Sequence, residues 1–184
     1  AGVSTGDVVL LSSQTASDSA SITFSSGIDS TYGEYIFRFY NCNPATNDAS
    51  FTFQVNATDG ADYNDSLMTT SVFESEHSED DSTIAALAYE ASDDQAQAAG
   101  FQILAEGIGN GGDESAAGEL HLFNPASTTY VKHFYATTNA YRHSDNSRQT
   151  FVAGYINDTT AIDDIQFKMA SGNFDGKIKM WGVK

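Results

Sequence analysis

The chain has 184 residues and a net charge of −17, from 25 acidic and 8 basic side chains. A field of this sign repels nucleic acid and anionic membranes, so neither is expected as a partner. The length suits one domain spanning 1–184, and we keep open that residues 1–20 form an extended N-terminal arm.

Alternation of apolar and polar residues is the dominant pattern along the chain, as in the Phe-Thr-Phe-Gln-Val-Asn run at 51–56. This period of two is typical of strands with one face on a core and one in water. The expected strands are 8–11, 21–24, 35–40, 51–56, 67–73, 85–89, 101–105, 120–123, 130–135, 151–156, 165–169 and 177–181. The fold class predicted is all-β: a two-sheet antiparallel β-sandwich, jelly-roll-like, with at most one short helix.

Four connections between these strands carry their own signals. The acidic run 74–81 is expected on an exposed loop, because five carboxylates do not suit a core strand. Residues 92–100 begin with a capping box and end in glycine, which predicts the one short helix. Turn residues predict β-hairpins around 123–127 and 171–176.

Chemistry-bearing motifs for catalysis are absent from the sequence, so we expect no enzyme and no catalytic residues. No resident cofactor is expected either, although calcium remains open. Asp59, Asp62 and Asp65 lie on one turn and offer the oxygen ligands that calcium prefers; a solvated acidic turn has the same sequence. Cys42 is expected to be a small buried side chain.

Two sets of residues are candidates for surface sites on strands. His121 and His133 fall on the two arms of one expected hairpin and could approach each other, with ordinary packing as the alternative to metal binding. Lys177, Lys179 and Trp181 alternate with Ile178 and Met180, so they are expected to face away from the core. With Lys184, these three residues are our candidates for a subunit contact.

Several segments together resemble a family of small virion structural proteins of tailed phages, common among aquatic and marine ones. They are SGIDSTY at 26–32, NPAT at 43–46, FTFQ at 51–54, HLFNP at 121–125, TYVKHF at 129–134, AGYIN at 153–157, FKMASGNF at 167–174 and GKIKMWG at 176–182. The resemblance implies a jelly-roll-like virion component on the head surface or the tail, assembled in the host cytoplasm.

The function expected from residues and resemblance together is that of a non-enzymatic virion structural protein, a capsid decoration or surface appendage. It would act by packing against other virion proteins and against its own copies in a homo-oligomer. The alternative is a carbohydrate-binding jelly-roll module at a tail-fibre or receptor-binding tip, with host glycans as partners.

Overall fold

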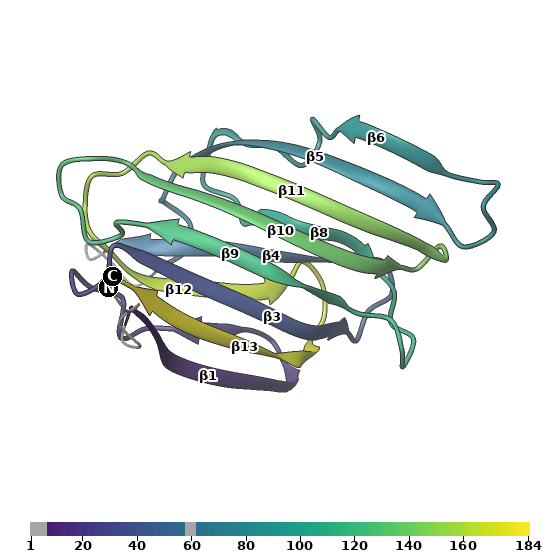
Figure 1. Cartoon of the computed structure of the whole chain (residues 1–184), viewed down its shortest axis with the longest axis horizontal. Coiled ribbons are helices and arrows are strands. Elements are labelled where there is room, and N and C mark those ends of the chain that lie inside the picture. The colour runs from purple at the N-terminus through teal and green to yellow at the C-terminus, as the bar shows by residue number, and fades with distance from the viewer. Residues whose placement is uncertain (1–6, 58–61) are drawn as a thin grey trace, which may run out of the picture.

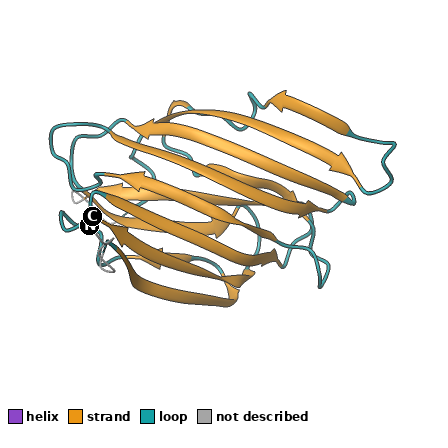
Figure 2. Cartoon of the chain, viewed as in Figure 1, coloured by secondary structure: helices purple, strands orange, loops and turns teal. Residues whose placement is uncertain are grey.

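The computed structural model describes residues 7–57 and 62–184, and this part of the chain consists of strands, turns and loops without a helix (Figure 2). It therefore contains no helix that could cross a membrane. The strands are β1 (Val8–Ser19), β2 (Ile22–Phe24), β3 (Glu34–Pro44), β4 (Ala49–Ala57), β5 (Met68–Ser78), β6 (Ala85–Tyr89), β7 (Ala96–Ala98), β8 (Gln102–Ile108), β9 (Ala116–Phe123), β10 (Lys132–Arg142), β11 (Asn146–Ile156), β12 (Ile162–Met169) and β13 (Phe174–Val183).

The strands form two layers, with every described pair antiparallel. The large sheet has the order β1-β13-β3-β9-β10-β11-β5, with β6 and β7 both paired to the edge of β5. The small sheet has the order β8-β4-β12-β2 and lies behind it (Figure 1). The chain passes repeatedly between the layers, as in a jelly roll, and confirms the predicted all-β sandwich.

The two layers also meet at their margins. On one side Arg142 of β10 pairs with Ile108 of β8. On the other, the side chain of Gln14 in β1 donates a hydrogen bond to the carbonyl oxygen of Thr23 in β2, at 2.7 Å. The sandwich is therefore nearly closed, and β1 is an integral edge strand of the large sheet.

An aromatic core fills the space between β3 and the small sheet. Phe167 of β12 lies at its centre, and its ring centroid is 5.2 Å from that of Phe39 and 5.4 Å from that of Phe37. All three side chains are buried, as is Cys42, whose burial raises the pKa of the thiol to about 12. The alternation seen in the sequence is thus the alternation between this core and the exterior.

The predicted helix at 92–100 is wrong. Ala96–Ala98 forms β7 and pairs with Met68 and Thr69 of β5, and Gln97 has a left-handed φ of 53° that a helix does not allow. The edge of β5 offers backbone partners to this segment, and tertiary pairing outweighs the local capping signal.

The hairpin predicted at 171–176 is also wrong, whereas the one at 123–127 is confirmed. β12 pairs with β4 and β2, while β13 pairs with β1 and β3, so residues 170–173 cross from one layer to the other. Met169 and Phe174 at the two ends of this crossing are both buried. Covering the core edge with these side chains requires a corner rather than a hairpin.

The acidic run 74–81 does not lie wholly on a loop. Glu74 and Glu76 belong to β5, whose partner across the sheet is β11, and Glu76 lies directly opposite Arg148. Two arginines from neighbouring strands neutralise these carboxylates inside the sandwich, so the strand continues through them.

Candidate functional site

The outer face of the large sheet, the side turned away from the small sheet, gathers most of the exposed apolar surface. Every exposed large apolar side chain of the described residues lies on it except Leu67, which immediately precedes β5, and Tyr130, which lies two residues before β10. The members on this face are Val8, Leu10, Tyr40, Phe73, Leu87, Tyr89 and Tyr135. Exposed apolar side chains that gather on one face, rather than scatter over the surface, are typical of interaction sites in soluble proteins.

One end of the outer face carries a basic-aromatic patch, which we define as Arg38, Tyr40, Lys177, Lys179 and Trp181. Lys179 lies opposite Arg38, and Lys177 lies opposite Tyr40, across the β13–β3 pairing. The guanidinium carbon of Arg38 is 5.3 Å from the Trp181 ring centroid, and Nζ of Lys179 is 5.4 Å from that of Tyr40. Cations at these distances are attracted to the ring faces, so the patch holds its charges in place.

The sequence-predicted contact residues thus partly come together. Lys177, Lys179 and Trp181 share the outward side of β13, as the alternation predicted, because Ile178 and Met180 between them are buried. Lys184 follows the strand, where its backbone nitrogen donates to the carbonyl oxygen of Asp7 at 3.0 Å. Arg38 and Tyr40 were not predicted; their place on β13's neighbour depends on strand order, which the sequence does not give.

Positive charge is scarce elsewhere on the described surface. Lys132 is fully buried, and its Nζ donates to the carbonyl oxygen of Asp158 at 2.9 Å. Arg142 and Arg148 are held by carboxylates in the interior. The patch therefore contains three of the five remaining cationic side chains, in a chain of net charge −17.

A shallow mid-sheet hollow of about 250 Å³ lies farther along the outer face. Its walls include Phe73, Phe151 and Tyr135, and the first two rings stack with centroids 4.8 Å apart. Phe73 is 46% exposed, so this stacked pair presents an apolar surface to solvent.

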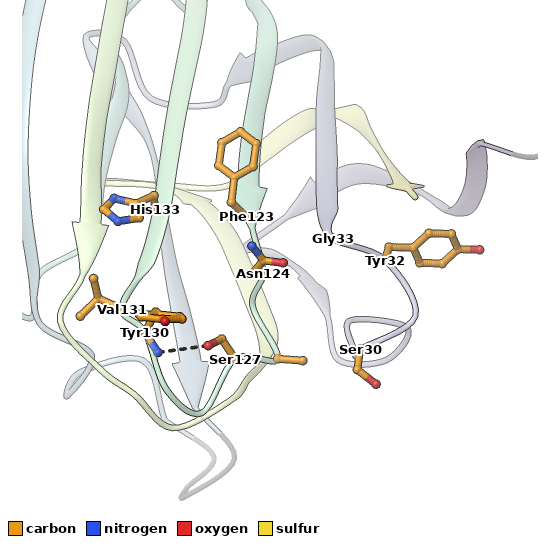
Figure 3. Close-up of a pocket in the computed structure, with 10 residues that line it drawn as sticks. Ser30, Tyr32, Gly33, Phe123, Asn124, Ser127, Tyr130, Val131 and His133 are labelled. Atoms are coloured by element: carbon orange, nitrogen blue, oxygen red, sulfur yellow. Dashed lines mark hydrogen bonds between the residues drawn. The ribbon is translucent and has the colours of Figure 1, made fainter. Parts of the chain in front are cut away.

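A larger end cavity of about 720 Å³ lies where the β9–β10 connection meets the loop before β3. Phe123 and His133 come from the two strands, while Asn124 and Tyr130 lie on the connection between them (Figure 3). The complete lining is Ser30, Tyr32, Gly33, Phe123, Asn124, Ala126, Ser127, Tyr130, Val131 and His133. The sequence did not predict this cavity, because its walls come from segments about ninety residues apart.

An ionic cluster lies inside the sandwich, on the inner side of β5 and β11. Arg148 contacts Glu76 at 2.7 Å and Glu74 at 3.1 Å, and it also pairs with Glu106 of β8. Arg142 of β10 contacts Glu76 at 2.8 Å. The cluster joins both layers through charge-assisted hydrogen bonds.

Burial raises the pKa of two carboxyl groups in this region. Loss of solvent around Glu74 raises its pKa to about 7, although nearby Arg148 opposes the shift. Loss of solvent, reinforced by the charges of Glu106 and Glu90, raises the pKa of Asp93 to about 6. Perturbed carboxyls of this kind occur at catalytic sites and in structural ion networks alike. Neither group lines the end cavity or the mid-sheet hollow, so the geometry favours the structural role.

The predicted metal and histidine sites gain no geometric support from the described residues. Asp59 lies outside them, and Asp62 and Asp65 are exposed. Within 7–57 and 62–184, no group of three or more His, Cys, Asp or Glu side chains is arranged to hold a metal ion. His121 lies opposite Tyr135 rather than His133, and its Nδ1 contacts Glu34.

No model of a known protein family and no curated protein matches this sequence.

Proposed function

We propose that this protein is a non-enzymatic structural component of a virion surface, a decoration or appendage that packs through the outer face of its large sheet. The observation that carries the proposal is the concentration of exposed apolar side chains and surface cations on that one face. The virion setting is supported only by the resemblance of the sequence segments described above.

Charge supports self-association as one part of this packing. The basic-aromatic patch carries Arg38, Lys177 and Lys179, whereas the turn after β5 carries Glu79, Asp80 and Asp81 at its tip. Arg38 is paired with Glu119 at 3.1 Å, so Lys177 and Lys179 supply the net positive charge of the patch. Local positive charge on a chain dominated by negative charge steers copies toward each other and fixes their orientation. The other virion proteins that it contacts would carry acidic surfaces with apolar areas on which Tyr40 and Trp181 can pack.

The association is tested by sedimentation velocity of the purified chain. We expect an oligomer that dissociates in the double variant Lys177→Glu, Lys179→Glu, with the far-UV spectrum unchanged. The matched control is Lys168→Glu, a basic residue of β12 in the other sheet. A monomeric wild type at high micromolar concentration would remove self-association from the proposal.

The location is tested separately by labelling purified virions with an antibody against the chain. Regular labelling of the head surface or the tail is the expected result. Detection only in extract of infected cells, with none on particles, would contradict a virion role.

A carbohydrate-binding module is a second candidate function, favoured by the aromatic side chains around the end cavity. A calcium site at Asp59, Asp62 and Asp65 is a proposed accessory to it. A glycan array probed with and without chelator tests both: loss of signal with chelator supports the calcium site, and no signal with an intact fold contradicts the module.

A further inference from the structure

The end cavity differs from the rest of the protein surface in its charge. The chain contains 25 acidic and 8 basic residues, yet none of the ten residues that line the cavity is Asp, Glu, Lys or Arg. A charged ligand would find no countercharge there, and an anionic one would also be repelled by the net charge of −17. The lining therefore selects for an uncharged ligand.

The cavity lining contains both aromatic rings and hydrogen-bonding groups. Phe123 offers a ring from β9, and Tyr130, which is 75% exposed, offers another from the connecting loop (Figure 3). The amide of Asn124, the hydroxyl of Tyr130 and the ring nitrogens of His133 make no hydrogen bond to another described residue. These groups can satisfy a ligand that has both an apolar face and hydroxyls.

Backbone contacts hold the walls in place. The backbone nitrogen of Asn124 donates to the carbonyl oxygen of Gly33 at 2.8 Å, which ties the two loops together. The backbone nitrogen of Tyr130 donates to Oγ of Ser127 at 3.1 Å, which fixes the base of its side chain. On the far side, the Tyr32 ring packs so closely on Gly182 that a Cβ there would lie 2.5 Å from it. A preformed site loses little conformational entropy when a ligand binds.

We propose that the end cavity binds one or two residues of a neutral glycan. The apolar face of a sugar ring would stack on Tyr130 or Phe123, and its hydroxyls would bond to Asn124 and His133. The volume of about 720 Å³ lies within the usual range for small-molecule sites. This assignment rests on the carbohydrate-binding candidate and is independent of packing through the basic-aromatic patch.

The test begins with the purified full chain on an array of neutral and acidic glycans, followed by calorimetric titration of the best ligand. We expect binding to neutral glycans only. Tyr130→Ala and His133→Ala should each weaken binding about tenfold or more, the loss expected for one stacking or hydrogen-bonding partner. Tyr89→Ala is the matched control, since Tyr89 is a similarly exposed tyrosine, 60% exposed, on β6, which pairs with β5 and contributes nothing to the cavity lining.

Each result decides a different point. Equal binding by Tyr130→Ala, His133→Ala and wild type would overturn the assignment of the cavity but keep the carbohydrate-binding candidate. Binding to acidic glycans alone would overturn the neutral ligand class. No binding by folded wild type would overturn both the assignment and the candidate. If Tyr130→Ala lowers the melting temperature, His133→Ala still decides the matter.

Discussion

The same two layers enclose two regions of opposite chemistry. Between β3 and β12 the interior is aromatic, with the rings of Phe37 and Phe39 both packed on Phe167. Between β11 and β8 the interior is ionic, with Arg148 among carboxylates from both sheets. Burial of the aromatic rings stabilises the fold at every pH. In a buried ion pair, the attraction between the charges is largely offset by the cost of removing both from water.

The ionic region has more acids than bases, and this imbalance is its informative property. Glu74, Glu76, Glu106 and Asp93 lie near only two arginines. The geometry pairs Glu76 with both arginines, which lower its pKa despite its burial, while Glu74 and Asp93 keep raised pKa values. We infer that the aromatic region determines how stable the fold is and that the ionic region determines how this stability depends on pH.

The largest expected effect comes from emptying the centre of the aromatic region. Phe167→Ala should lower the free energy of unfolding by about 3–5 kcal/mol, because a fully buried ring leaves a cavity between the two sheets. Urea denaturation followed by circular dichroism measures it. Phe73→Ala, an exposed ring of the outer face, is the control and should cost about 1 kcal/mol or less. Equal losses in the two variants would contradict the placement of the core.

Breaking the ionic region should cost somewhat less. Arg148→Met should lower the free energy of unfolding by about 3 kcal/mol at pH 8, since it leaves the buried carboxylate of Glu74 without a cationic partner. The matched control is Arg38→Met, which breaks the exposed pair with Glu119 and should cost about 1 kcal/mol or less. A loss in Arg148→Met that is no larger than the control's would show that the cluster is solvated in solution.

The pH dependence distinguishes the two regions directly. Glu74 binds its proton more tightly in the folded chain, with a pKa of about 7 against an ordinary 4.5. Its contribution to stability is therefore complete below pH 4.5 and is lost as the pH rises through 7. Asp93, with a pKa of about 6, has the same sign.

We expect the free energy of unfolding to fall by about 1–3 kcal/mol between pH 5 and pH 8, and Glu74→Gln to remove much of that fall. Melting temperatures across this range measure it, with the exposed Glu79→Gln as control. A wild type that gains stability across the range would contradict the raised pKa values.

The smallest effect is expected on the outer side of the large sheet. Trp181→Ala should change the free energy of unfolding by about 1 kcal/mol or less, whereas Met180→Ala, one residue earlier and buried, should cost about 2–5 kcal/mol. The same urea denaturation compares the two. A reversed order would mean that Trp181 packs inward and would remove it from the basic-aromatic patch.

Strand positions were predictable because side chains alternate between the two faces of a strand, so apolar residues at every second position indicate the face that packs on the core. β6 was predicted with its observed bounds, and the expected strands 35–40 and 151–156 lie inside β3 and β11. The extension of β5 through Glu74 and Glu76 was not predictable, because the arginines that neutralise these carboxylates are about seventy residues away. The short strand β7 was missed for a similar reason, since its partner edge lies on β5.

The sequence by itself determined the all-β class, the inward and outward sides of most strands, and the outward direction of Lys177, Lys179 and Trp181. Period-two alternation encodes these features locally. Only the tertiary structure decided that Arg38 and Tyr40 lie beside them, that an ionic cluster occupies part of the interior, and that an uncharged cavity lies at the end of the large sheet. Those features depend on the order of the strands in the sheets and on which loops contact each other, and both are set by contacts between residues far apart in the chain.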